Sequence, residues 1–383
     1  MRRLSIVCLM LLCTGLTTLG GAPVSSAVGD GYPATHEGRR PASPARTSDT
    51  VRTVPEQGLR AVDTNAAAPT HLRVLVMRVY WSKHPPASPD HSTMRGLMKD
   101  TAAWFARVSG GRQHLTSKVT SWLEVGAGDA NCSELQPTFE RAVAAARSRG
   151  VDTRGYDRFM VVSPQCASTS FAELPGRVTW IREATPYLAV LVHELGHNLG
   201  LDHANSSICS QDRRRVTEGG RCFTQEYGDM WGAMGLSDRP YSVPQLQSLG
   251  WAGRVVTTNR PGSWTLRDAE RSGGGIQALR VRSGNVSYWL EYHTNPVALA
   301  RSAATFAIRG VPGLQIRLDT GGKSLRILDA APGHPSDYLS YPDPDFVNVA
   351  LPVGSTFTTP RGLRITLTAQ GATKATVRIS GVS

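Results

Sequence analysis

One segment, residues 185–203 with the sequence TPYLAVLVHELGHNLGLDH, restricts the local fold more than any other part of the chain. Thr185 suits an N-cap, and Pro186 suits the first helical position, where its missing N–H costs nothing. Apolar residues follow at helical spacing, which predicts a helix with one buried face. The helix should end at Gly200, because glycine adopts a positive φ at little cost. The chain can then turn back, which lets His203 approach the helix.

Two histidines lie on this predicted helix, and a third lies just beyond it. His193 and His197 are four residues apart, so their imidazoles share one face and can reach one zinc ion at about 2.0–2.1 Å. His203 can supply a third ligand, which leaves a fourth position for water, as in catalytic sites. Glu194 is turned by about 100° from His193, beside the metal, where it can act as a general base. The pattern predicts one catalytic Zn²⁺; buried core histidines or a structural zinc are the alternatives, and a structural zinc would leave Glu194 without a role.

The spacing H-E-x-x-H-x-x-G-x-x-H resembles that of the metzincin zinc endopeptidases. Members of that clan have a methionine-containing turn beneath the metal, and residues 226–235, EYGDMWGAMG, resemble the Tyr-Gly-Asp…Met-Gly segment of the gametolysin-like family. The resemblance assigns the turn to Met234, with Met230 the weaker candidate; two loop methionines that fill a core gap are the alternative. Some metzincins add a tyrosine ligand two residues later, where this chain has Leu236, so no fifth protein ligand is expected.

The resemblance implies a secreted endopeptidase that binds an extended polypeptide in a cleft above the helix. Residues 178–181 are the candidate edge strand for pairing with the substrate, and residues 234–241 are the candidate wall of a substrate pocket. Two other functions stay open. One is a zinc amidase that acts on a non-protein substrate, and the other is a wall- or matrix-binding protein that uses its C-terminal part.

The predicted elements change in character along the chain. Strands are expected at residues 72–81, 159–162 and 178–181 and helices at residues 92–108, with Ser92 as N-cap, and 135–149. Their alternation predicts an α/β (α+β) metzincin-like catalytic domain with a central twisted sheet and an active-site helix, over residues 70–251. From residue 252, short β-rich runs are separated by glycine and proline turns, which predicts an all-β, sandwich-like domain over residues 252–383.

The N-terminus has the pattern of an export signal. Arg2 and Arg3 precede an apolar run over residues 4–19, and Ser25-Ser26-Ala27 offers a small-residue cleavage site, so residues 1–27 are predicted to be a signal peptide. The alternative, a membrane anchor, is disfavoured because the run is short and interrupted. Residues 28–69 are too poor in apolar side chains to order themselves, which indicates a flexible leader or the prosegment of a zymogen. A secreted protein without stable membrane insertion is therefore expected.

The cysteines fit this location. The chain has six, of which the first two lie in the predicted signal peptide. The remaining four form two disulfides in an oxidising compartment, and three pairings are possible. We favour Cys132–Cys166 and Cys209–Cys222, because each closes a local loop.

The remaining charged residues suggest no further chemistry. The net charge of +12 is spread along the chain without a basic stripe, so nucleic-acid binding is not expected. Asp343 and Asp345 lack the rest of a calcium-loop pattern, so a calcium site is possible but unsupported. Six of the other histidines lack ligand spacing: His71, His84, His91, His114, His293 and His334.

Overall fold

The computed structural model describes residues 50–51, 70–81, 84–126, 132, 134–166, 169–212, 214–235, 237–294, 298–300, 307–309, 311–321, 325–332 and 348–381. The contacts of the chain divide it into residues 1–46 and 47–383, so every described residue lies in the second unit. The predicted signal peptide, Asp343 and Asp345 lie outside the described residues.

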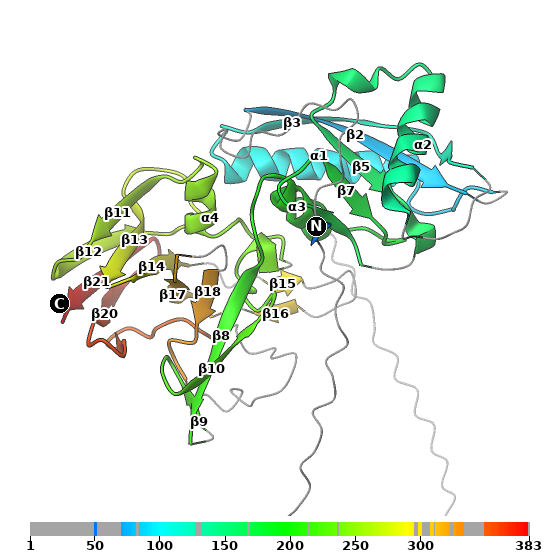
Figure 1. Ribbon diagram of the computed structural model, residues 1–383. Helices are drawn as coiled ribbons and strands as arrows, with labels where there is room; N and C mark the ends of the chain where they lie inside the picture. Colours follow the sequence, from blue (N-terminus) through cyan, green and yellow to red (C-terminus); the bar gives the residue numbers. More distant parts are fainter. Residues whose placement is uncertain are drawn as a thin grey trace, which may run out of the picture. The chain divides into compact units, whose positions relative to one another are not determined.

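The first part of the described chain is built on a seven-stranded sheet (Figure 1). Its strands are β1 (Thr50–Val51), β2 (His71–Tyr80), β3 (His114–Val119), β4 (Leu123–Glu124), β5 (Arg158–Val162), β6 (Phe171–Glu173) and β7 (Val178–Ile181). The order is β1-β6-β7-β5-β2-β3, with β4 paired to β2 beyond β3. All pairs are parallel except β6 with β7, which forms an antiparallel hairpin.

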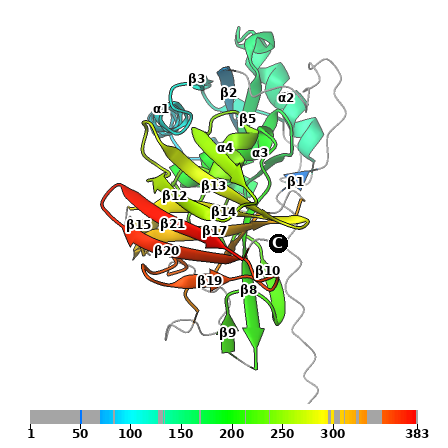
Figure 2. The same cartoon turned by 90° about the vertical axis from the view of Figure 1, so that its left-hand side faces the viewer.

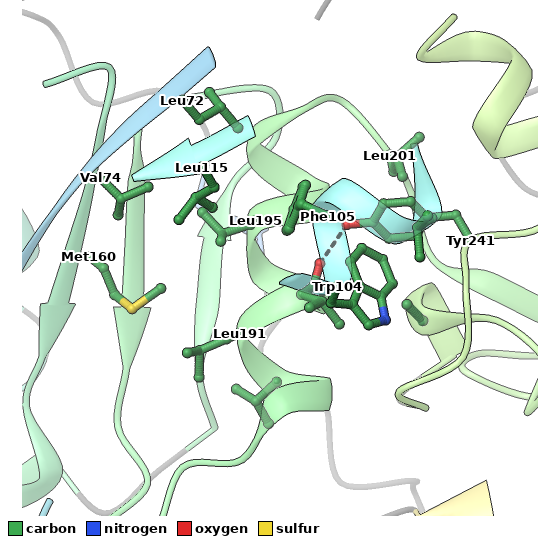
Figure 3. Close-up of a cluster of buried hydrophobic side chains, with 14 of the residues drawn as sticks. Leu72, Val74, Trp104, Phe105, Leu115, Met160, Leu191, Leu195, Leu201 and Tyr241 are labelled. Atoms are coloured by element: carbon green, nitrogen blue, oxygen red, sulfur yellow. Dashed lines mark hydrogen bonds between the residues drawn. The ribbon is translucent and has the colours of Figure 1, made fainter. Parts of the chain in front are cut away.

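Helices cover both faces of this sheet, because successive side chains of a strand point in opposite directions. Helix α1 (His91–Val108) and helix α3 (Leu188–Asn198) pack on the face that includes Leu72 and Val74 of β2 (Figure 3). Helix α2 (Leu135–Ser148) packs on the opposite face. The two cores are therefore separated by the strands, and α1 and α3 lie on the same face of the sheet in contact with each other.

Helix α1 begins differently from the prediction. Its N-cap is Asp90 rather than Ser92, and the Asp90 carboxylate accepts hydrogen bonds from the Thr93 N–H (2.7 Å) and the Ser92 hydroxyl (2.8 Å). The Thr93 backbone bond, followed by the Ser92 bond, lowers the pKa of Asp90 to about 2. A carboxylate is the better cap here because it accepts both donors and complements the helix dipole.

The prediction that residues 178–181 form an edge strand was wrong. Strand β7, residues 178–181, lies between β5 and β6 and has no free edge. The antiparallel strand β6 lies outside it, and the outer side of β6 pairs with β1, through Thr50 with Ala172 and Val51 with Glu173. Residues of the predicted leader therefore contribute a strand to this sheet.

The second part of the described chain forms a twelve-stranded sheet. Residues 298–300 and 307–309 form a separate two-stranded sheet. The elements here are β8 (Ala204–Gln211), β9 (Arg214–Val216), β10 (Arg221–Gln225), α4 (Val243–Ser248), β11 (Arg254–Thr258), β12 (Gly262–Arg267), β13 (Ile276–Ser283), β14 (Val286–His293), β15 (Ala298–Ala300), β16 (Ala307–Arg309), β17 (Gly313–Asp319), β18 (Leu325–Leu328), β19 (Thr356–Thr358), β20 (Arg364–Gln370) and β21 (Lys374–Ser380). The main path runs β10-β8-β18-β17-β14-β13-β12-β21-β20-β19.

This large sheet includes strands from both sides of residue 251 (Figure 2). Strand β8 begins directly after His203 and pairs in parallel with β18, with Ala204 opposite Leu325. A buried apolar core is shared by β12, β13, β14 and β17 to β21, including Leu290, Ile316 and Ile365. The mixed α/β class is confirmed, whereas the sandwich-like arrangement of residues 252–383 stays a prediction.

Both predicted disulfides are confirmed. Cys132 is bonded to Cys166, and Cys209 is bonded to Cys222. The second pair joins directly opposite positions of β8 and β10, with a Cα–Cα distance of 4.0 Å. Among the described helices, none combines the length and the apolar character needed to cross a membrane.

Candidate metal centre

Helix α3 carries two of the three predicted ligands and ends as the sequence indicated. It starts at Leu188 with Tyr187 as N-cap, later than the predicted start at Pro186. At the other end, Gly200 has a φ of 92°. The Gly200 N–H donates to the His197 carbonyl (2.8 Å) and the Leu201 N–H donates to the Gly196 carbonyl (3.0 Å). This pair of bonds is the Schellman motif, and it reverses the chain toward the helix.

The reversal brings the three predicted histidines together. The Nε2 atom of His197 lies 3.1 Å from that of His193 and 3.1 Å from that of His203. All three side chains are buried, and their candidate ligand atoms lie within 4.8 Å of one another. His193 and His197 come from one face of α3, whereas His203 precedes β8.

The opposite nitrogen of each ring is held by an acceptor. The three contacts are His193 Nδ1 with the Ala233 carbonyl (3.0 Å), His197 Nδ1 with the Leu201 carbonyl (2.8 Å) and His203 Nδ1 with Glu226 Oε1 (2.6 Å). Because a carbonyl or carboxylate oxygen only accepts, each Nδ1 carries the hydrogen. In the neutral form of each ring the lone pair then lies on Nε2, and such orientation by outer contacts is typical of metal-bound histidines.

This donor set fits a zinc ion. The Nε2 atom of His197 lies 3.1 Å from those of both His193 and His203, and neutral nitrogens this close repel one another unless a cation lies among them. Tetrahedral bonds of about 2.0–2.1 Å separate nitrogen ligands by about 3.3 Å. Burial, followed by repulsion from His203, lowers the pKa of His197 to about 3. Burial also lowers the pKa of His193 well below its usual value, with added repulsion from the other two rings. Both imidazoles are therefore neutral at pH 7, as a metal ligand must be.

Glu194 and Asn198 occupy neighbouring positions on α3. The Glu194 side chain is 3% exposed and follows His193 directly. Asn198 ties the end of α3 to the β6–β7 hairpin, because its amide donates to the carbonyls of Glu173 (3.0 Å) and Val178 (3.1 Å). Its side-chain oxygen accepts from the Thr179 hydroxyl (2.8 Å). The hairpin is thereby fixed beside the histidines.

The methionine turn lies against the same helix. Met234, in the short 3-10 helix η3 (Ala233–Gly235), is fully buried, and a Cβ built on Gly196 would lie 2.5 Å from its sulfur. The Tyr241 hydroxyl donates to the Val192 carbonyl (2.6 Å), as the dashed line in Figure 3 shows. Tyr241 is therefore part of the core beneath α3. Met230 is also buried, whereas Leu236 lies outside the described residues.

The close approach at Gly196 makes a substitution there costly. We expect Gly196→Ala to destabilise the folded chain by about 1–3 kcal/mol, because the new methyl group overlaps Met234 and lies 2.9 Å from the Tyr241 hydroxyl oxygen. Urea denaturation measures the change. Gly96→Ala is the matched control, since α1 has open space at that position and alanine favours helices. Equal stability of both variants with the parent chain would contradict the packing described here.

Two residues of the site were not singled out from the sequence. Glu226 contacts His203 through its carboxylate, and the Tyr227 ring lies 4.1 Å from the His203 ring, centroid to centroid. Tyr227 also has a φ of 58°, which is uncommon for a non-glycine residue. Both residues lie in the segment 226–235, whose resemblance to the gametolysin-like family points to its methionines. That resemblance alone does not indicate that Glu226 and Tyr227 contact a histidine ligand.

The geometry defines a class of site: a pair of histidines on one helix and a third histidine beyond a glycine turn form a three-ligand set for one metal ion. Residues 115–280 match the family model of the gametolysin peptidases, M11. The predicted resemblance to the gametolysin-like family is thereby confirmed, and over these residues the chain is similar to a metallopeptidase. The matched stretch contains all three histidines and Met234, and it runs past residue 251 into β13. No curated protein matches the chain.

Proposed function

We propose that the chain is a secreted zinc-dependent endopeptidase that hydrolyses peptide bonds of extracellular or cell-wall proteins. The observation that carries this proposal is the convergence of three Nε2 lone pairs, each fixed by a hydrogen bond at the opposite Nδ1. The family match supports peptidase chemistry. The two disulfides are compatible with export to an oxidising compartment.

The residues divide into holding and proton-transferring groups. His193, His197 and His203 would hold the zinc ion through Nε2. A bound zinc ion would supply Lewis acidity, polarising the scissile carbonyl and making water more acidic. The Glu194 carboxylate accepts a proton from the attacking water and passes it to the leaving amine nitrogen. Glu226 keeps the His203 ring in the orientation that points its Nε2 toward the Nε2 atoms of the other two histidines.

The hairpin beside α3 suggests how substrate binding is controlled. We infer that an extended peptide pairs with β6, because β6 has one side paired to β7 and its other side paired to the two residues of β1. Since β1 lies in the predicted leader, removal of residues 28–69 would expose the outer edge of β6. This agrees with the prosegment of a zymogen, and N-terminal sequencing of the active protein would show whether the leader has been cleaved.

The proposal is tested on the full chain, exported to an oxidising compartment. Zinc content is measured by elemental analysis, and casein cleavage is followed with and without a zinc chelator. We expect about one zinc per chain and loss of cleavage on metal removal, with recovery when zinc is returned. Cleavage that persists in fully metal-free protein would disprove the metal-dependent mechanism, and cleavage of a wall amide but of no polypeptide would favour an amidase.

A further inference from the structure

Six charged side chains, five of them buried and Glu270 partly buried, form a cluster between the methionine turn and the large sheet. They are Asp229, Arg239, Glu270, Glu291, His293 and Arg317, called here the Arg317 cluster. Glu291 and His293 belong to β14 and Arg317 to β17. Asp229 and Arg239 belong to the segment that follows β10. The cluster therefore joins residues next to the metal centre to strands far along the chain.

Arg317 makes the central contact of this cluster. Its Nε donates to Asp229 Oδ2 (2.7 Å) and its Nη2 donates to Asp229 Oδ1 (3.3 Å), which is a two-pronged contact with one carboxylate. Its Nη1 pairs with Glu291 Oε1 at 2.9 Å, and its Nη2 also donates to Gln315 Oε1 at 3.0 Å. Arg317 and Asp229 are both fully buried, so this contact is not weakened by solvent.

The charges of the cluster balance. Burial disfavours the charged form of His293, but its hydrogen bonds to Glu270 and Glu291 outweigh this and raise its pKa. Burial alone would raise the pKa of Glu270, whereas His293 and Arg239 lower it to about 2. When His293 is protonated, three carboxylates face two guanidinium groups and one imidazolium. A balanced, paired cluster can remain buried, whereas loss of one member leaves an uncompensated charge.

Asp229 connects Arg317 to the methionine turn, because its side chain and its backbone both contact residues of that turn. Its Oδ1 accepts from the Trp231 N–H (2.9 Å), which shapes the start of the turn. Its carbonyl oxygen packs so closely against Gly235 that any side chain there would overlap it. Between these two points lies Ala233, whose carbonyl accepts from His193 Nδ1.

Asp229 also reaches the element that carries the third histidine. Its N–H donates to the carbonyl of Ala204 (3.2 Å), the residue directly after His203. The parallel pairing of β8 with β18 begins at this same residue. One residue, Asp229, therefore contacts both the turn that orients His193 and the strand start that places His203.

We propose that Arg317 is a positioning residue of the metal centre, which acts by clamping Asp229 and so fixes His193 and His203 relative to each other. This inference rests on the proposed function, because it assumes that the histidines bind zinc. It makes the large sheet part of the support of the site. Arg317 lies beyond residues 115–280, so the family match itself does not include it.

The test compares two buried arginines in the full-length chain. Arg317→Lys keeps a positive charge but cannot reach both Asp229 oxygens with a planar fork. Arg78→Lys is the matched control, because Arg78 belongs to β2 in the other sheet, is 3% exposed and donates to the Pro89 carbonyl (2.8 Å). Zinc affinity is measured by competition with a coloured chelator, and the absorption spectrum of the Co²⁺-loaded chain reports ligand geometry. Circular dichroism verifies that each variant is folded.

We expect Arg317→Lys to weaken zinc binding by about 10–100-fold and to alter the Co²⁺ spectrum, as is typical when outer contacts of a metal site are lost. Arg78→Lys should lower the melting temperature of the metal-free chain without changing zinc affinity. A purely structural role for Arg317 would lower only the melting temperature. Folded Arg317→Lys with unchanged zinc affinity and an unchanged Co²⁺ spectrum would overturn the inference.

A second variant covers the case in which Arg317→Lys does not fold. Asp229→Asn keeps an acceptor for the Trp231 N–H but removes the charge that Arg317 clamps. The same weakening of zinc binding is expected, and unchanged affinity in the folded variant would overturn the inference. The parent chain separates the two hypotheses: if it binds no zinc, the proposed function itself fails, whereas tight binding in parent and variants alike refutes only the role of Arg317.

Discussion

Glu194→Ala is expected to lower the rate of peptide hydrolysis by about 10²–10⁴-fold while the chain keeps its zinc, since this is the usual contribution of a positioned general base. The zinc should stay because the proposed ligands are His193, His197 and His203. The Glu194 side chain is buried next to His193 in the sequence and is shielded from bulk solvent. Cleavage of casein and zinc content are measured on the same preparation.

Glu194→Gln separates proton transfer from packing. Glutamine has nearly the same shape but cannot accept a proton at neutral pH, so this variant should be as inactive as Glu194→Ala. If both variants cleaved casein at the parent rate with zinc bound, Glu194 would not be the base. If Glu194→Ala lost its zinc as well, the activity result would report metal loss instead of proton transfer.

The second large effect is expected from His203→Ala, which should weaken zinc binding by more than the roughly 10–100-fold that follows loss of an outer contact. The variant removes a donor whose Nε2 lies 3.1 Å from that of His197, and it leaves two nitrogen ligands in a buried site. Titration with a competing chelator measures the affinity. His114→Ala is the control, because His114 is an exposed residue at the start of β3, and its zinc affinity should equal that of the parent. Equally tight binding by His203→Ala would show that the third ligand is wrongly assigned.

Several features could be predicted because they depend on residues close together in the chain. The glycine turn after α3 is one, since the positive φ of Gly200 and the two hydrogen bonds around it involve only residues 196–201. The pairing of Cys209 with Cys222 is another, because the two cysteines are only 13 positions apart and lie on paired strands. Helix starts were less accurate, because Asp90 and Ser92 both suit an N-cap and only the local geometry selects between them.

Strand order was harder to predict than strand position. Residues 178–181 were correctly expected to form a strand, but they occupy the interior of the sheet rather than its edge. The three residues of β6 have no alternating pattern long enough to be recognised, and β1 has only two residues. Periodicity reports which way side chains face along one strand and says nothing about which strand becomes its neighbour.

The amino-acid sequence by itself determined the identity and spacing of the histidines and the glycine turn that reverses the chain, because the turn depends on backbone geometry over a short span. For the disulfides the sequence favoured one of three pairings, and the folded chain, which brings Cys132 to Cys166 across 34 positions, selected it. Only the tertiary structure decided which acceptors orient the rings and what supports them. Arg317 meets Asp229 across 88 positions of sequence, through strands whose pairing is settled by burial of the whole sheet. A contact of that kind leaves no periodic trace, since its free energy depends on exclusion of water by residues that are distant in the chain.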